Sequence, residues 1–287
     1  MVEDKNDLRL TRRSFLSAAA AVGAAVFLKA NLPEVAAAIT DSGKKLVWLR
    51  GSGCGGCTSS LLNGGEPDLL AALAKIGLEP AYQEELMPQQ GVFVDGSPAG
   101  DSEHNSNLLL QELIDGGGYV LVVEGAIPGG PEGSGRYCMS GAVPFKDTFI
   151  AAAPGASCII AAGTCASYGG VSGLNEMADA AGVAFAGTSK SRGAMARYGL
   201  DNKVINVPGC PLHPDWLLLV LADAMSANDI ALDMYGRPAA FFGASVHDSC
   251  PRRGAYDRAA RDSQFSGGGC LYSLGCKGPV ASADCPA

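Results

Sequence analysis

Four short apolar runs stand out along the chain, and each leads into a turn rich in glycine, proline or polar residues. They cover 46–49, 119–123, 157–161 and 204–207. Runs that are apolar throughout, without alternation, indicate strands buried on both faces of a sheet. Helical patterns lie between and after them, over 61–73 with an interruption near Pro67, 107–116, 145–153 and 216–225. Strands alternating with helices predict an α/β fold with a parallel sheet.

The starts of two of these helices have candidate caps. Thr58 or Ser59 is expected to cap the helix that follows the first strand, and Asn107 is expected to cap the second helix. Both assignments rest on the preference of short polar side chains for helix N-termini. The polar segment 91–107 that precedes the second helix is predicted to be a loop.

The N-terminus has the order of an export signal. Arg12 and Arg13 precede an uncharged stretch from Ser14 to Leu28, and Ala36-Ala37-Ala38 follows as a small-residue cleavage site. The stretch is too short to span a bilayer. An arginine pair before a mildly apolar run resembles a twin-arginine signal, so residues 1–38 are predicted to be removed on export to the periplasm. The alternative, an amphipathic helix, lacks a polar face between Ala18 and Ala25.

The alternation of strands and helices stops near Gly236-Arg237-Pro238. We therefore divide the mature chain into a sheet domain, 39–235, and a C-terminal domain, 236–287. The second segment shows no convincing long helix or strand, yet it holds His247 and several cysteines. A segment this long without regular elements needs another source of stability, and metal ligation is the natural candidate.

Composition narrows the function classes. The 287 residues are 47% hydrophobic, enough for a large core, and the formal net charge of −8 excludes nucleic acid as a partner. Only 17% of residues are charged, which favours a surface that is largely covered by something else. The twin-arginine route carries proteins that are already folded and loaded with cofactors. The ten cysteines are therefore expected to bind metal rather than to form disulfides.

Four cysteines follow predicted strands, where ligands of open parallel sheets bind. Cys54 and Cys57 follow the first strand, Cys165 the third and Cys210 the fourth, and each lies among glycines. Four thiolates with room around them suit a 4Fe-4S cluster. A structural zinc site and a redox-active Cys-x-x-Cys pair are the alternatives, and both fit the wide spacing less well. Cys158 lies inside an apolar strand and is interpreted as a core thiol.

A second group follows in the C-terminal domain. His247 and Cys250 are three positions apart, and Cys270 and Cys276 come later. One imidazole and three thiolates suit either zinc or an iron-sulfur cluster, and spacing alone leaves this choice open. Cys285 has no evident partner in the sequence.

Together these motifs resemble the small subunit of nickel-iron hydrogenases. The matching segments are Gly53-Cys54-Gly55-Gly56-Cys57, Glu124-Gly125-Ala126-Ile127-Pro128, Gly163-Thr164-Cys165-Ala166-Ser167-Tyr168-Gly169-Gly170, Gly209-Cys210-Pro211, His247-Asp248-Ser249-Cys250-Pro251-Arg252, and Cys270 to Pro279. They span nearly the whole mature chain. The resemblance implies a flavodoxin-like domain with a proximal 4Fe-4S cluster on Cys54, Cys57, Cys165 and Cys210, and a distal 4Fe-4S cluster on His247, Cys250, Cys270 and Cys276.

The resemblance also implies a partner. The nickel-iron centre would belong to a large subunit in a heterodimer, where hydrogen is split, and this chain would relay electrons to a cytochrome-type or other redox acceptor without a catalytic residue of its own. A third, medial cluster of the 3Fe-4S or 4Fe-4S type would use Cys285 and two later cysteines. The sequence stops at Cys285-Pro286-Ala287. We expect a fragment; the alternatives are that another polypeptide supplies the remaining ligands or that the medial cluster is absent. Membrane attachment stays open.

Two other functions compete with this interpretation. One is an exported, non-catalytic protein whose C-terminal segment is held together by zinc. The other is the iron-sulfur subunit of a related respiratory complex, which would share the four cysteines of the sheet but lack the histidine-cysteine segment.

Overall fold

The computed structural model describes residues 43–65, 69–95, 97–226 and 230–282. These residues form two compact units that part after Pro238, three residues beyond the boundary expected from the sequence. We call 43–238 the sheet unit and 239–282 the C-terminal unit. The predicted signal, 1–38, lies outside the described residues. Within the described ranges, no helix is long and apolar enough to cross a membrane.

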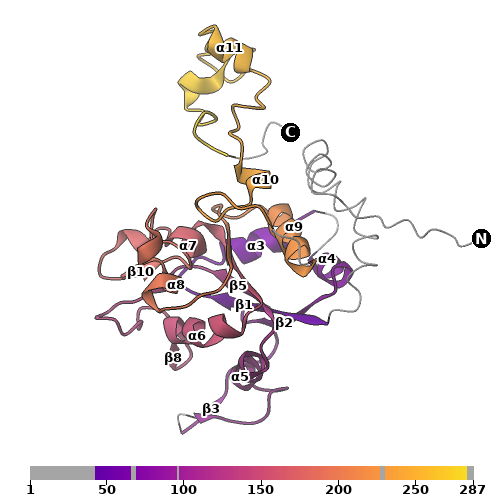
Figure 1. Ribbon diagram of the computed structural model, residues 1–287, viewed down its shortest axis with the longest axis vertical. Helices are drawn as coiled ribbons and strands as arrows, with labels where there is room; N and C mark the ends of the chain where they lie inside the picture. The colour runs from indigo at the N-terminus through magenta and orange to yellow at the C-terminus, as the bar shows by residue number, and fades with distance from the viewer. Residues whose placement is uncertain (1–42, 66–68, 96, 227–229, 283–287) are drawn as a thin grey trace, which may run out of the picture. The chain divides into compact units, whose positions relative to one another are not determined.

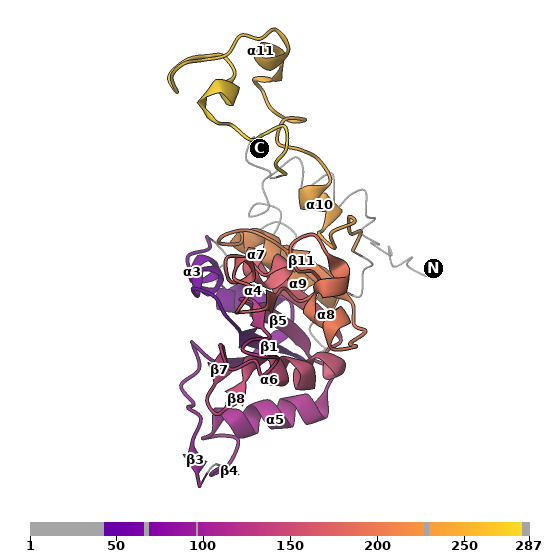
Figure 2. The same cartoon turned by 90° about the vertical axis from the view of Figure 1, so that its left-hand side faces the viewer.

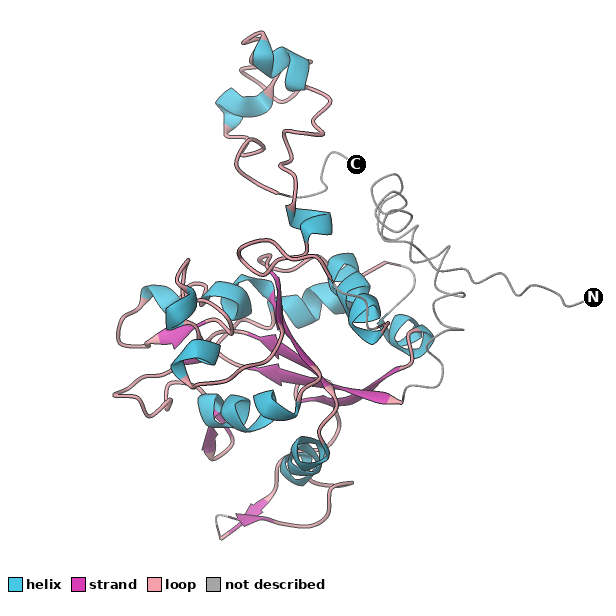
Figure 3. Ribbon diagram, in the orientation of Figure 1, coloured by secondary structure: helices cyan, strands magenta, loops and turns pink. Residues whose placement is uncertain are grey.

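The sheet unit is built on five parallel strands in the order β11-β9-β5-β1-β2 (Figures 1 and 3). The strands are β1 (Lys44–Arg50), β2 (Leu78–Gln83), β5 (Val120–Glu124), β9 (Cys158–Ala162) and β11 (Val204–Val207). All five residues of β5 and of β9 are buried. The predicted α/β class with a parallel sheet is confirmed, and four of the five strands coincide with the apolar runs.

Strand β2 was not predicted. Its sequence, LEPAYQ, buries only Leu78 and Tyr82 and has Pro80 in its middle. Proline donates no ladder hydrogen bond and is therefore confined largely to sheet edges. That is where β2 lies, and among the strands that the structure describes it pairs with β1 alone.

Helices cover both faces of the sheet (Figure 2). Phe145 and Phe149 of α6 and Leu110 and Leu113 of α5 pack in one core with Leu121. Helices α3, α4 and α9 lie on the opposite side. The helices of the sheet unit are α3 (Gly56–Leu62), α4 (Leu69–Lys75), α5 (Ser106–Gly116), α6 (Phe145–Ala152), α7 (Gly163–Tyr168), α8 (Ala194–Arg197) and α9 (Pro214–Met225).

Both predicted caps were wrong by two or more residues. Helix α3 begins earlier, after Gly55, whose φ of 72° is left-handed, a conformation that glycine adopts without strain. The hydroxyl of Thr58 bonds instead to the carboxylate of Glu124. In α5 the cap is Asn105, whose side chain accepts a hydrogen bond from the backbone N–H of Asn107.

Short elements complete the sheet unit. They are the two-residue strands β3 (Phe93–Val94), β4 (Ser97–Pro98), β6 (Ile127–Pro128), β7 (Met139–Ser140), β8 (Val143–Pro144) and β10 (Ala180–Ala181), and the 3-10 turns Ala153–Gly155, Ser172–Leu174 and Lys190–Arg192. The β3–β4 hairpin lies within the segment 91–107 that was predicted to be a loop.

The C-terminal unit has little regular structure. It contains α10 (Ala239–Phe242), α11 (Arg253–Asp257) and a 3-10 turn, Leu271–Leu274. Of its described apolar side chains, only Phe242 and Cys270 are buried. So small a core agrees with the expectation that this unit needs a stabilising metal group.

Candidate metal centres

Four cysteines lie at the carboxyl edge of the sheet. Cys54 and Cys57 follow β1, with Cys57 inside the first turn of α3; Cys165 lies in α7 directly after β9, and Cys210 follows β11. The thiols are close enough for their charges to act on one another. Cys54 and Cys165 raise the pKa of Cys57, and Cys54 and Cys210 raise that of Cys165, although burial is the larger cause in both. The fold thus brings the four predicted ligands of the sheet unit together.

Glycines make room for two of these thiols. A Cβ at Gly163 would lie 2.4 Å from Cys57 Sγ, and a Cβ at Gly170 would lie 2.5 Å from Cys165 Sγ. Gly163 has a φ of +85° and Gly170 one of +53°, so side chains at these positions would also be strained. The space beside the sulfurs is kept free of carbon, which fits a bulky inorganic group held by the four thiols.

Hydrogen bonds tie the loops of this site together. The backbone N–H and the hydroxyl of Thr164 both donate to the carbonyl of Gly209, at 2.9 and 3.1 Å. The hydroxyl of Ser60 donates to the carbonyl of Leu212 (2.9 Å). The residues before Cys165 are therefore joined to the residue before Cys210, and α3 is joined to the same loop, which fixes the spacing of the ligands.

Glu124 is a site residue that spacing did not identify. It ends β5, between the strands that lead to Cys57 and Cys165, and it is 2% exposed. Its carboxylate accepts hydrogen bonds from the backbone N–H of Cys57 (3.0 Å), from the N–H and hydroxyl of Thr58, and from the indole of Trp48 (3.2 Å). The available signal was a lone acidic residue at the end of an apolar strand.

Burial makes two thiols of the sheet site, Cys57 and Cys165, weaker acids than an ordinary cysteine. It raises the pKa of Cys57 to about 12, and it also raises the pKa of Cys165. Without metal these groups hold their protons at neutral pH, so metal binding must displace those protons. Cys158 lies in β9 and is buried, as expected for a core thiol.

The other four predicted ligands line one cavity of the C-terminal unit. Its volume is about 60 Å³, and its wall contains His247, Cys250, Cys270 and Cys276 together with Tyr256 and Tyr272. The sulfur of Cys270 accepts a hydrogen bond from the N–H of Tyr272, and that of Cys276 accepts one from the N–H of Gly278, both at 3.4 Å. Such bonds stabilise the thiolate form that binds iron, and three thiols with one imidazole fit an iron-sulfur cluster.

Two further observations concern the other possible metal ligands of the chain. Cys285 lies outside the described residues. Within the described ranges, no three His, Cys, Asp or Glu side chains form a group suited to a single metal ion.

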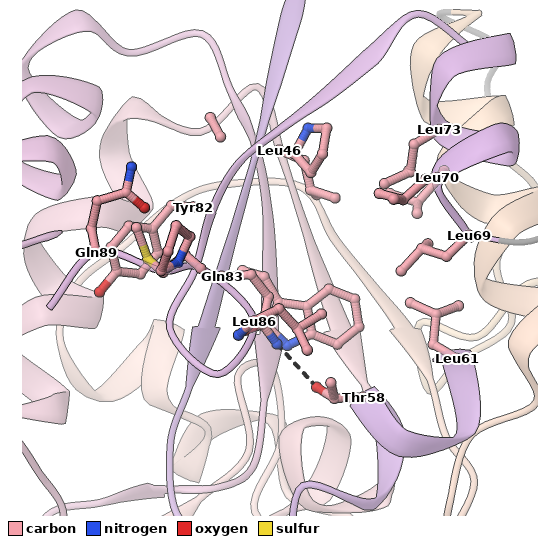
Figure 4. A pocket seen from close by; sticks show the side chains of 16 residues that line it. Leu46, Thr58, Leu61, Leu69, Leu70, Leu73, Tyr82, Gln83, Leu86 and Gln89 are labelled. Carbon is pink, nitrogen blue, oxygen red and sulfur yellow. Dashed lines mark hydrogen bonds between the residues drawn. The ribbon is translucent and has the colours of Figure 1, made fainter. Parts of the chain in front are cut away.

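The sheet unit also has a cavity, larger than the one around His247, that lies away from the four cysteines. It measures about 380 Å³ and lies between Leu61, Leu69 and Leu73 on one side and Tyr82 and Leu86 on the other (Figure 4). Its lining contains no thiol and no imidazole. Its volume makes it prominent, but the groups that bind metal are elsewhere. One link joins the two places: Gln83 at the cavity donates to the hydroxyl of Thr58 (3.2 Å), which bonds to Glu124.

Two family models match the chain. The model described as NADH ubiquinone oxidoreductase, 20 Kd subunit, matches residues 54–224 of the sheet unit, and the C-terminal model of the NiFe/NiFeSe hydrogenase small subunit matches residues 242–287. The fold and the two ligand groups thus define a class of oxidoreductase subunits with a parallel-sheet domain and a cysteine-rich C-terminal unit. Because the second model covers the histidine-cysteine segment, the respiratory-complex alternative is disfavoured.

Individual relatives specify the family. The small subunit of F420 non-reducing hydrogenase II from Methanosarcina mazei is 46% identical over 297 residues, which cover 99% of this chain and 77% of the relative. The periplasmic [NiFeSe] hydrogenase small subunit of Desulfomicrobium baculatum is 32% identical, over 97% and 88%. A solved structure of the Ni-Fe-Se hydrogenase from Desulfomicrobium baculatum, in a reduced, active form, matches with a TM-score of 0.70 and 30% identity, over 85% of this chain and 87% of that one. The chain belongs to the nickel-iron hydrogenase small subunit family and is a subunit of a hydrogenase.

Proposed function

We propose that this chain relays electrons between the nickel-iron centre of a large subunit and a redox acceptor during hydrogen oxidation. Cys54, Cys57, Cys165 and Cys210 would hold a proximal 4Fe-4S cluster, and His247, Cys250, Cys270 and Cys276 a distal one. The observation that carries the proposal is that eight ligands far apart in sequence form two groups, one within each unit.

Clusters held at these two places supply one-electron redox chemistry. The residues around each cluster would determine how far water reaches it and how electron-rich its ligands are. Cys57 and Cys165 are half-buried, whereas Cys54 and Cys210 are exposed, so this chain alone shields only one side of the proximal group from water. N–H donors to Cys270 and Cys276 make the distal thiolates less electron-rich. A neutral imidazole from His247 in place of a thiolate leaves the distal group less negative, which raises its reduction potential.

Three exposed apolar side chains within one short segment support the assignment of a large-subunit partner. Val171, Leu174 and Met177 are 79%, 83% and 71% exposed and follow closely on Cys165 and Gly170. Apolar side chains gathered on a surface mark a protein interface. A large subunit seated here would cover the proximal site and bring its own centre near it.

The finer parts of the proposal rest on sequence and on relatives. The pattern of residues 1–38 supports export by the twin-arginine route, and relatives named as periplasmic support the compartment. A cytochrome-type or other redox acceptor and a medial 3Fe-4S or 4Fe-4S cluster using Cys285 are proposed from the resemblance alone, and membrane attachment stays open.

The test compares two cysteines of the sheet unit that lie on successive elements. In the purified heteromer, Cys165→Ala should abolish hydrogen-dependent dye reduction, whereas Cys158→Ala should leave most of it. Exchange of deuterium with protons needs only the nickel-iron centre and should persist in the Cys165 variant. Equal dye reduction in the two variants, at equal subunit assembly, would refute the proximal assignment.

Metal and sulfide analysis of the same preparations distinguishes this proposal from the alternative in which the C-terminal unit binds zinc. Iron and acid-labile sulfide sufficient for two clusters support the proposal. Zinc at the His247 group, with iron confined to the sheet unit, would contradict the distal assignment.

A further inference from the structure

Four side chains of the C-terminal unit form a continuous stack that starts at a proposed ligand. The rings of His247 and Tyr256 are in edge-to-face contact with their centroids 4.5 Å apart, and the rings of Tyr256 and Tyr272 make the same kind of contact at 5.4 Å. The guanidinium of Arg261 lies over both tyrosines, 4.8 Å from the ring centroid of Tyr272 and 5.6 Å from that of Tyr256. We call these four residues the arginine–tyrosine stack.

The outer end of this stack is charged and open to solvent. Arg261 is exposed, and Tyr272 is 43% exposed. Arg252 and Arg253 of the same unit pair with Asp262 and Asp248. Across the described residues, by contrast, no Asp or Glu forms an ion pair with Arg261. The two aromatic faces hold this guanidinium in place by cation–π attraction, so little side-chain entropy remains to be lost when a carboxylate binds it.

The charge of this unit differs in sign from that of the chain. Residues 239–287 contain five Lys and Arg against four Asp and Glu, a net charge of +1, whereas the whole chain carries −8. Partner choice at an interface follows local charge complementarity. The global charge favours a basic partner, and the local charge at the stack favours an acidic one.

We propose that the arginine–tyrosine stack is the docking face for an acidic electron-transfer protein, with Arg261 as its central contact. The proposal rests on the proposed function, because it assigns the acceptor of the distal group that His247 would hold. Each acceptor molecule takes one electron, so two are reduced for every hydrogen molecule that the hydrogenase oxidises to two protons. Arg261 forms ion pairs with partner carboxylates, and Tyr272 supplies apolar contact area beside it.

The experiment uses the assembled hydrogenase and two soluble haem proteins of opposite charge, the acidic domain of cytochrome b5 and a basic mitochondrial cytochrome c. Binding is measured by titration calorimetry, and hydrogen-dependent haem reduction is measured optically. Cytochrome b5 should bind more tightly at low salt and weaken steeply as salt rises, because exposed charges are screened. Arg261→Glu should weaken its binding and lower kcat/KM on the order of 10-fold.

A matched variant controls for net charge. Lys190→Glu makes the same charge reversal at an exposed position of the sheet unit and should leave cytochrome b5 binding as it is. Preference for cytochrome c, or equal loss in both variants, would overturn the proposal. Separation of the subunits by Arg261→Glu would also overturn it, since the stack would then belong to the intersubunit interface.

Failure of the proposed function has a different signature. It would appear in the unmodified hydrogenase as deuterium–proton exchange without hydrogen-dependent reduction of either haem protein or of dye. In that case the calorimetric titration tests the docking proposal by itself. Salt-sensitive binding of cytochrome b5 that is lost in Arg261→Glu supports the proposed docking face, and a lack of such binding refutes it.

Discussion

Gly163 opens α7 at the point where β9 ends, and its missing side chain leaves room for the sulfur of Cys57. The residue therefore meets two demands at once, a positive φ of 85° and a contact that leaves no room for carbon. The first demand costs an alanine on the order of 1 kcal/mol. The close contact has a larger effect, because a methyl group at this position would displace the sulfur of Cys57, a proposed ligand.

We predict that Gly163→Ala lowers the iron content of the sheet unit and with it hydrogen-dependent dye reduction, since the new methyl group displaces the thiol of Cys57. Gly187→Ala is the matched control, because Gly187 also has a positive φ (57°) but a Cβ added there would have no atom within 4 Å. It should lose stability without losing iron. Iron and sulfide assays on both variants decide; equal iron loss would show that strain, not the sulfur contact, is responsible.

A second single residue, Tyr119, makes the stability of the fold depend on pH. Its hydroxyl donates to the carbonyl of Ala152 (2.5 Å), and burial raises its pKa from 10.0 to about 12. The folded state therefore holds this proton more tightly than the unfolded state does. The stability that follows from this is complete below about pH 10 and is lost as the pH rises toward 12.

Tyr119→Phe should accordingly flatten the loss of thermal stability between pH 10 and 12, while costing about 1 kcal/mol at neutral pH through the lost hydrogen bond. Unfolding midpoints measured by circular dichroism across this pH range provide the test. Unchanged alkaline curves would mean that other groups, such as Tyr82 or Tyr168, whose pKa values are also raised to about 12, dominate.

Helix α3 shows what an element gains from a neighbouring strand. It has seven residues, too few to be stable alone, and its first N–H groups bond to the carboxylate of Glu124 on β5. A negative charge at a helix N-terminus is favourable. The strand that lies between the ligand-bearing strands therefore fixes the start of the helix that carries Cys57.

We predict that Glu124→Ala destabilises the sheet unit by about 1–3 kcal/mol, because buried donors at Cys57, Thr58 and Trp48 lose their acceptor. Glu124→Gln keeps an acceptor oxygen and should lose less. Urea unfolding of the two variants gives the difference, and iron retention during the titration shows whether the helix start holds the proximal ligand. Identical losses in the two variants would contradict the argument.

At the same scale, the sequence predicted elements better than their boundaries. The apolar runs located β1, β5, β9 and β11 because these strands, including the edge strand β11, are largely buried on both faces. Strand β2 was missed because it contains Pro80 and buries only two of its six residues. The helix starts were misplaced because a left-handed Gly55 and the tertiary bonds of Thr58 to Glu124 depend on neighbours that are distant in sequence.

At the scale of the whole molecule, the described residues form one unit with a large core and one with a very small core. Most of the buried apolar side chains belong to the sheet unit, and the described part of the C-terminal unit buries only Phe242 and Cys270. A unit of this kind folds when its ligands bind metal.

Removal of iron from the purified hydrogenase with chelator and oxidant should therefore unfold 239–282 selectively. Peptide-resolved hydrogen exchange should show fast exchange throughout this segment, while β5 and β9 remain protected. Protection that persists in the C-terminal unit after complete loss of iron would mean that packing alone holds it.

At the scale of the whole molecule, the sequence predicted the placement of those residues whose position follows from the order of the strands. Parallel strands place their carboxyl ends at one edge, so Cys54, Cys57, Cys165 and Cys210 could be grouped from the order of strands and cysteines along the chain. Glu124 lies in one of the matching segments, but its role in the site was not predicted, because a single acidic residue has no spacing pattern that indicates its contacts. The stack of Arg261 on Tyr256 and Tyr272 was hidden because nothing in the spacing of those residues indicates that their side chains meet.

The hydrogen bond from Trp48 to Glu124 has an optical consequence. The chain has two tryptophans. Trp48 reaches the carboxylate that holds Cys57 in position, and Trp216 is a buried residue of α9, stacked on His213. An iron-sulfur cluster absorbs where indole emits, so a cluster at the sheet edge would quench this light, the more strongly the nearer the indole. Intrinsic fluorescence would then follow the loading and loss of the proximal group in real time, without an added label, and rise as iron departs.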